Sequence, residues 1–135
     1  MIQQTTLHLP AFSKGFHLIT HLVLKQLPPL PEAGILHLFI QHTSAGLTLN
    51  ENADPTVRTD PDAGFNRLAP EGSHYIHDDE GPDDMPAHIK STLAGSSVSI
   101  PVTGSKLNLG TWQGIYLCEF RTRARSRTIV ATICY

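Results

Sequence analysis

The segment GILHLFIQH, residues 34–42, constrains the fold more than any other stretch of the chain. Apolar residues occupy both alternating sets of positions in this segment. In one set, Leu36, Leu38 and Ile40 are followed by His42. Because successive side chains of a strand point to opposite faces, the pattern predicts a central strand that is covered on both faces. The same alternation directs His42 toward the buried side.

Turn residues divide the rest of the chain into short elements. Further strands are expected at 3–9, 46–52, 97–102, 114–121 and 127–134, and the segment 16–27 is expected to begin as a strand and continue as a helix. Two capped helices are expected, because Asp-Pro at 54–55 and Asp-Met-Pro at 84–86 each combine an N-cap with a proline in the first turn. The first helix runs to about Leu68, with a possible interruption at 60–61.

The second helix should end at Gly95 and bury a stripe formed by Met85, Ile89 and Leu93. With 135 residues, the chain fits a single domain, 1–135. We therefore predict a compact α+β domain with a mainly antiparallel β-sheet of about six to seven strands and two or three helices.

Composition argues against several classes of function. The formal net charge of −2 gives no general attraction to nucleic acid or to an anionic membrane. No apolar stretch approaches the roughly 18–20 residues of a transmembrane helix. The first ten residues lack the basic leader and apolar segment of a signal peptide, so a cytoplasmic location is expected. Cys118 and Cys134 lie in expected strands and are interpreted as buried core residues.

Histidine is abundant, with eight residues, and three of them occupy informative positions. His42 is either a core histidine held by Thr43 or Ser44, or a ligand. His88 falls near the first turn of the second helix, where the helix dipole disfavours an imidazolium, and it is either a surface residue or a neutral base or ligand. His77 belongs to the acidic segment 70–84, which is either a solvated loop or a functional one.

A metal site formed by His42, His77 and His88 would have to be assembled by folding, because their spacing is not a known zinc pattern. Three nitrogen ligands and a water suit Zn²⁺. Two histidines and a carboxylate would also suit a transition metal with open coordination positions.

Glu119 shares one face of its expected strand with Ile115 and Leu117. A carboxylate in that position is either a general base or partner of a histidine, or half of an ion pair with Arg121 or a residue across the sheet. The sequence alone leaves these alternatives open.

The run RTRARSR places arginine at 121, 123, 125 and 127. On an extended chain all four side chains would point the same way. They form either a charged hairpin end that protects a sheet edge or, for one or two of them, part of a phosphate site.

Three blocks of sequence, FIQHTSAGLTLNENADPTVRTD, DDEGPDDMPAHIKSTLAGSSVSIPV and LNLGTWQGIYLCEFR, resemble the YjbQ-like family, also called secondary thiamine-phosphate synthases. The similarity spans Phe16 to Ile133. It implies a compact α+β domain that assembles as a homotrimer. It also implies a weak transferase activity of thiamine biosynthesis, in which a pyrimidine-methyl diphosphate is joined to a thiazole phosphate and pyrophosphate is released.

The resemblance also assigns roles by position within these blocks. The catalytic residues it implies are His42, His88 and Glu119. The residues expected to contact substrate are Thr43, Ser44, Asn52, Trp112, Gln113 and Arg121. A divalent metal ion, zinc or magnesium, is expected on His42, His77 and His88. The chain departs from the family at RTRARSR, where relatives often have a Gly, Asp or Pro turn, and this leaves the roles of Arg123 and Arg125 open.

Together these features predict a small enzyme with a histidine-rich pocket at a subunit boundary, acting on a small phosphate-bearing molecule. The small residues Ser44, Ala45 and Gly46 are expected to leave room for the ligand, and the polar residues 50–52 are expected to orient the imidazole of His42 or to bind substrate. Two alternatives stay open. The first alternative is a non-enzymatic module that binds a metabolite or a metal, and the second is a metal-dependent hydrolase.

Overall fold

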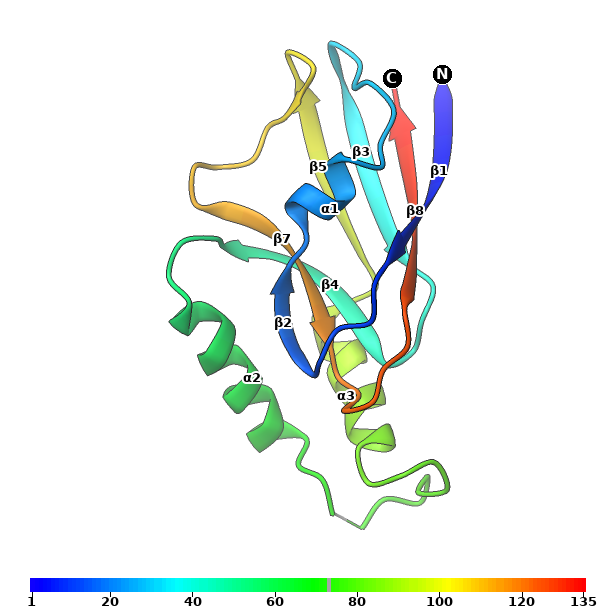
Figure 1. Ribbon diagram of the computed structural model, residues 1–135, viewed down its shortest axis with the longest axis vertical. Coiled ribbons are helices and arrows are strands. Elements are labelled where there is room, and N and C mark those ends of the chain that lie inside the picture. The colour runs from blue at the N-terminus through cyan, green and yellow to red at the C-terminus, as the bar shows by residue number, and fades with distance from the viewer. Residues whose placement is uncertain (73) are drawn as a thin grey trace.

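The computed structural model describes residues 1–72 and 74–135 (Figure 1). Its strands are β1 (Ile2–Leu9), β2 (Gly15–Leu18), β3 (Ala33–Ile40), β4 (Ala45–Glu51), β5 (Ser97–Thr103), β6 (Lys106–Leu107), β7 (Gln113–Glu119) and β8 (Arg127–Cys134). Its helices are α1 (Thr20–Leu24), α2 (Thr56–Leu68) and α3 (Asp84–Ala94). No helix among the described residues is long and apolar enough to cross a membrane.

The strands form two antiparallel sheets. The larger sheet has the order β1-β8-β3-β5-β6, and the smaller has the order β2-β7-β4. Buried side chains from both sheets join in one hydrophobic core between them. The predicted α+β class is confirmed, and the sheet is divided in two and contains eight strands in place of six to seven.

Strand β3 shows why two sheets are needed. It lies between β5 and β8, which confirms the predicted central strand. Leu36 and Leu38 are fully buried against the second sheet, whereas Ile35 and Phe39 on the other face are 51% and 42% exposed. The prediction that both faces are covered is therefore wrong for the single chain, because each sheet covers only one face of the other.

Helix α3 has a different buried face from the one predicted. Its buried residues are Asp84, Pro86, Ala87 and Lys90. Leu93, expected in the buried stripe, is 55% exposed. The helix is rotated because the buried carboxylate of Asp84 is held by ion pairs on the inner side, so apolar spacing alone does not set the phase of the helix.

The other helices differ from the prediction in length and continuity. Helix α1 occupies only Thr20–Leu24 and does not reach residue 27. Helix α2 runs through Pro61 without an interruption.

The predicted N-caps are each displaced by one residue, since Pro55 caps α2 and Asp83 caps α3. Asp54 Oδ1 still accepts hydrogen bonds from the backbone N and the hydroxyl of Thr56, at 2.9 and 2.8 Å.

The connection from β7 to β8 passes between the two sheets, so the hairpin end expected for the arginine run is wrong. This connection is closed by a buried ion pair. Arg127 Nε and Nη2 donate to the two carboxylate oxygens of Glu119, at 2.7 and 2.6 Å. Glu119 is fully buried and Arg127 is 8% exposed. Of the alternatives for Glu119, the structure favours the ion pair, and the partner is Arg127 and not Arg121.

The two cysteines have different environments. Cys118 is buried, as predicted, and burial raises the pKa of its thiol to about 12. Cys134 is exposed near the end of β8, so its predicted place in the core is wrong. The difference follows from strand alternation, because Ile133 takes the inward position at that end of β8.

The buried pair predicts a large asymmetry between single and double substitutions. We expect Glu119→Ala to destabilise the fold by about 3–5 kcal/mol, because Arg127 would stay buried without a counter-charge. A Glu119→Leu/Arg127→Met double variant should recover much of this loss. Urea denaturation would measure both, with Arg125→Ala as an exposed control that should change stability by less than about 0.5 kcal/mol. A loss below about 1 kcal/mol for Glu119→Ala would contradict the expectation.

Candidate functional site

Asp84 is the centre of a cluster of charged and polar side chains. Its carboxylate is 1% exposed. His77 Nε2 lies 2.7 Å from Oδ2, and His88 Nε2 lies 3.3 Å from Oδ1. Arg121 Nη1 donates to Oδ1 at 2.5 Å. One ligand atom each from His77, Asp84 and His88 lie within 4.8 Å of one another, so these three residues could hold a metal ion.

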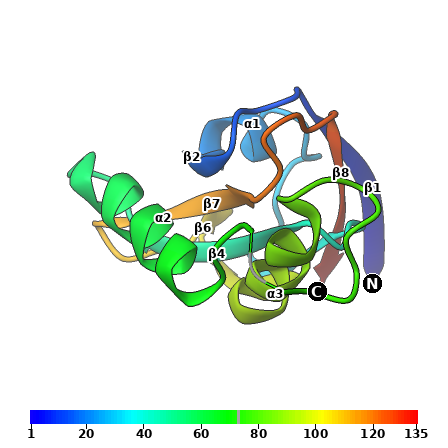
Figure 2. The same cartoon turned by 90° about the horizontal axis from the view of Figure 1, so that it is seen from below.

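Three elements bring the cluster together at one end of the molecule (Figure 2). Asp84 begins α3, where the helix dipole stabilises a carboxylate, and His88 follows one turn later on the same face. His77 comes from the loop that precedes the helix. Arg121 follows the end of β7 and reaches across to α3.

Arg121 also ties the acidic loop to the sheet. Its Nε donates to Asp83 Oδ2 at 3.0 Å, and its Nη2 donates to the backbone oxygen of Glu80 at 2.9 Å. Burial by itself raises the pKa of Asp83, but the hydrogen bond from the Thr122 backbone and the charge of Arg121 outweigh it, and the net shift is downward. Asp83 is therefore held as a carboxylate beside the guanidinium of Arg121.

The hydrogen bonds of His88 identify which ring nitrogen carries its proton. His88 Nδ1 lies 2.8 Å from the backbone oxygen of Thr43. Since a carbonyl oxygen only accepts, Nδ1 must donate, and Nε2 of a neutral imidazole then presents a lone pair. That lone pair faces Asp84 Oδ1, another acceptor. Two acceptors at 3.3 Å require a proton or a cation between them.

This donor set fits a transition metal. A metal-binding histidine commonly donates its second ring nitrogen to a backbone carbonyl, as His88 does to Thr43. Two imidazoles and one carboxylate suit zinc or a similar ion better than magnesium, which prefers oxygen ligands. The sequence leaves two ligand sets open, three histidines or two histidines with a carboxylate. The structure brings together the second set.

His42 lies outside the cluster and has a different hydrogen-bond partner. The backbone N–H of Thr128 donates to His42 Nε2 at 2.8 Å, so Nδ1 carries the proton of the neutral ring. Burial lowers the pKa of His42, the charge of Arg127 lowers it further, and Glu119 opposes both. A metal on Nε2 would displace the Thr128 hydrogen bond. In the group that could hold a metal, Asp84 therefore takes the place predicted for His42.

His42 lines two neighbouring pockets. One, of 340 Å³, is shared with Thr43, His88 and Ser91. The other, of 520 Å³, is shared with Ser44 and the loop between β7 and β8. The predicted residues His42, Thr43, Ser44, His88 and Arg121 are thus brought to one end of the molecule.

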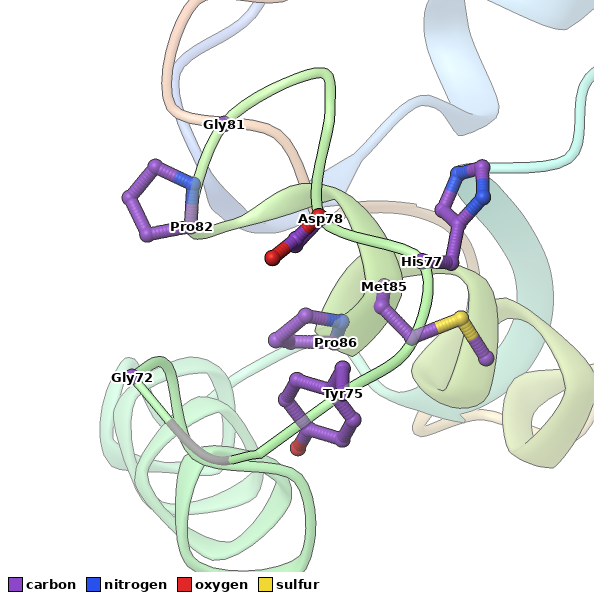
Figure 3. A pocket seen from close by; sticks show the side chains of 8 residues that line it. All are labelled: Gly72, Tyr75, His77, Asp78, Gly81, Pro82, Met85 and Pro86. Atoms are coloured by element: carbon purple, nitrogen blue, oxygen red, sulfur yellow. The ribbon is translucent and has the colours of Figure 1, made fainter.

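A third pocket, of 320 Å³, lies under the acidic loop (Figure 3). It is lined by Tyr75 and Pro86 among others, and His77 directs its ring to the opposite side of the loop. The ring of His77 instead meets His88 edge to face, with centroids 5.4 Å apart. The loop that carries His77 therefore separates this third pocket from the cluster around Asp84 (Figure 3).

Asn52, Trp112 and Gln113 do not join the site in the single chain. Gln113 begins β7 and pairs with Glu51, whereas Glu119 at the far end pairs with Ala45. The length of β7 separates the two ends by about 20 Å. Trp112 is 64% exposed. The polar residues 50–52 lie at the same distant end, so they cannot orient His42 as predicted.

Of the three small residues expected to leave room for a ligand, Ala45 and Gly46 are closely packed, and Ser44 lines a pocket. A Cβ on Gly46 would lie 2.8 Å from Ala94 Cβ and 2.8 Å from the backbone oxygen of Gly95. Ser91 Oγ also donates to the backbone oxygen of Ala45 at 2.8 Å. The space beside Ala45 and Gly46 is therefore filled by the end of α3, which packs on β4.

Asp84 is the functional residue that sequence reasoning missed, since its position before Pro86 predicts only a helix cap. The signal that could have found it is the spacing Asp84-x₃-His88, which places a carboxylate and an imidazole on one helix face. Sequence reasoning also missed the role of Arg127. It is one of four arginines at alternate positions of the run RTRARSR, and nothing in that run indicates which of them is buried.

Comparison with known proteins gives a consistent family. The model of the "UPF0047 protein YjbQ-like" family matches residues 5–135. The chain is 53% identical over 135 residues to "UPF0047 protein YjbQ" of Escherichia coli O157:H7, covering 98% of each chain. It is 43% identical over 94 residues to "UPF0047 protein YugU" of Bacillus subtilis, covering 67% of this chain and 70% of the relative.

Crystal structures of similar proteins share the fold. A YjbQ/UPF0047 family protein of Clostridium acetobutylicum superposes with a TM-score of 0.82 and 37% identity, covering 96% of this chain and 99% of the other. A conserved hypothetical protein of Thermus thermophilus gives a TM-score of 0.81 and 35% identity, covering 93% and 97%. The names of these proteins state no activity. The chain belongs to the YjbQ-like UPF0047 family.

Proposed function

We propose that the protein is a small transferase with a thiamine-phosphate-synthase-like activity, acting at the cluster around Asp84 and the pocket shared by His42 and His88. The observation that carries the proposal is the grouping of His77, Asp84 and His88 ligand atoms within 4.8 Å of one another, with His88 Nδ1 2.8 Å from a backbone oxygen, as in metal-binding histidines. The family resemblance supplies the substrate class, a pyrimidine-methyl diphosphate and a thiazole phosphate.

His77, Asp84 and His88 would hold the metal ion. Such an ion would neutralise charge on the diphosphate of the substrate. In the reaction, the bond between the pyrimidine methylene carbon and the diphosphate oxygen breaks, and pyrophosphate leaves with the electron pair. The thiazole nitrogen forms the new bond to that carbon. Stabilising the charge of the leaving group is the main catalytic requirement.

The protein's own residues would orient the reactants. The Thr43 carbonyl fixes the ring of His88 in one tautomer, and Arg121 holds the Asp84 carboxylate. Burial and Arg127 lower the pKa of His42 and keep its ring neutral, so its Nδ1–H is a donor for an oxygen of the leaving pyrophosphate. Glu119 acts on this site only through Arg127, which it positions.

We also propose a homotrimer with sites at its subunit boundaries. Asn52, Trp112 and Gln113, which the resemblance assigns to substrate, would then contact the site of a neighbouring subunit. The exposure of Trp112 at the distant end of β7 supports this arrangement. The exposed apolar side chains Ile35 and Phe39 on the outer face of β3 also favour assembly.

A metal-dependent hydrolase is the second candidate. The observation that favours it is the exposure of the His77 side chain, 52%, which lets water reach the cluster. Phosphatase and amidase assays on metal-loaded protein would detect this activity. A kcat/KM for coupling far below about 10⁴ M⁻¹s⁻¹, with no hydrolysis, would instead favour a binding module.

The first prediction concerns metal content. Protein purified without a chelator or a histidine tag should contain about one zinc or similar ion per chain by elemental analysis. His88→Ala and His77→Ala should each weaken metal affinity more than about tenfold, because each removes a ligand. His42→Ala should leave the metal content unchanged. Loss of metal in His42→Ala alone would restore the three-histidine site and contradict this assignment.

The second prediction concerns activity. Pyrimidine–thiazole coupling, followed by pyrophosphate release, should fall at least about tenfold in His42→Ala and at least about a hundredfold in His88→Ala. His21→Ala, at an exposed position of α1, serves as a matched control and should retain activity. Unchanged coupling in folded His42→Ala and His88→Ala would end the proposal.

The third prediction concerns assembly. Light scattering after gel filtration should give three times the 14.8 kDa mass of the chain. If neighbouring subunits share sites, His88→Ala and Trp112→Ala should each be inactive as pure trimers, and trimers refolded from a mixture should regain part of the activity. A monomeric mass, or no recovery on mixing, would contradict the shared site.

A further inference from the structure

Four arginines, from the loop after β7 and from the first position of β8, line a single pocket beside the candidate metal cluster. The pocket has a volume of 520 Å³ and is lined by Arg121, Arg123, Arg125 and Arg127 together with His42 and Ser44. The loop leaves β7 after Glu119 and returns as β8 at Arg127. The segment between them is not a strand, so the arginines gather because the loop curls and not because side chains alternate.

Two of these arginines are neutralised by buried or nearly buried carboxylates. Arg121 pairs with Asp83 and Asp84, and Arg127 pairs with Glu119. These contacts fix two walls of the pocket. Preorganised walls lower the entropy that binding would otherwise cost.

The other two arginines have no such partner. Arg123 and Arg125 are exposed, and within the part of the chain that the structure describes they form no ion pair. Glu80 is the acidic residue that lines the pocket, and its backbone oxygen is bound by Arg121. Two uncompensated guanidinium groups facing one carboxylate leave the pocket positive in a chain whose net charge is −2.

Neutral donors accompany these charges. His42 Nε2 accepts from the Thr128 backbone, which leaves Nδ1–H as the donor of a ring that lines the pocket. Ser44 Oγ accepts from Arg127 Nη2 at 3.0 Å, so its own hydroxyl hydrogen can be donated elsewhere. Guanidinium forks with adjacent N–H and O–H donors match the oxygens of a phosphate group.

We infer that this pocket binds the diphosphate group of a small-molecule ligand, with Arg123 and Arg125 as its anchoring residues. The inference deepens the proposed function and rests on it in assigning the anion to a substrate diphosphate. The volume falls within the range of small-molecule sites. A nucleic-acid backbone fits less well, because the lining contains no Phe, Tyr or Trp on which a base could stack.

Isothermal titration of inorganic pyrophosphate into the protein, stripped of metal and then dialysed, tests the inference. We expect wild-type protein to bind pyrophosphate more tightly than orthophosphate. Arg123→Gln and Arg125→Gln should each weaken pyrophosphate binding about tenfold or more, because each removes a charge-assisted hydrogen bond. Both residues are exposed, so thermal unfolding should confirm that the variants stay folded.

Two controls give the result its meaning. Arg67→Gln makes the same substitution at an exposed position of α2 and should leave affinity unchanged. Lys25→Gln removes a positive charge at an exposed position just after α1 and should also leave pyrophosphate affinity unchanged. If pyrophosphate binds in this pattern but coupling activity is absent, the proposed function fails while the diphosphate site stands.

Several outcomes would overturn the inference. These are no binding of pyrophosphate by wild-type protein at millimolar concentration, an equal loss of affinity in Arg67→Gln, or orthophosphate binding at least as tightly as pyrophosphate. Displacement of pyrophosphate by a lower concentration of a single-stranded oligonucleotide would indicate a nucleic-acid surface and would equally overturn it.

Discussion

The buried carboxylate of Asp84 joins the parts of the molecule that form the candidate site. It accepts from Arg121, which follows the central strand of the smaller sheet, and it contacts His77 from the acidic loop and His88 from its own helix. A carboxylate that is 1% exposed is stable only with such partners. The orientation of α3, the position of the loop and the facing of the two histidines therefore follow from a single buried charge.

The connection between β7 and β8 applies the same principle twice. Glu119 neutralises Arg127, and the pair of Asp83 and Asp84 neutralises Arg121. Arginines that are paired in this way become part of the framework, whereas those between them in the sequence remain at the surface with their charge uncompensated. The group that could hold a cation and the pocket lined by arginines thus lie next to each other, an arrangement that suits the proposed diphosphate substrate.

Strand positions were predictable because alternation and turn residues are local signals. The segments around Leu36, Ile100 and Ile129 form strands close to their expected limits. The site was predictable only in part. His42 and His88 border one pocket, as expected. The group of residues that could hold a metal ion, however, contains Asp84 in place of His42. Trp112 lies at the wrong end of β7 for a site within one chain.

The sequence by itself determined the class of fold, the family and the residues from which a site can be built, because strand alternation, capping residues and motif blocks are all encoded locally. Only the tertiary structure decided which charges pair. The four arginines are equivalent in the sequence, yet two are paired with buried carboxylates and two are not. The physical reason is that pairing depends on which long-range contacts place a carboxylate within reach of each guanidinium, and spacing along the chain does not carry that information.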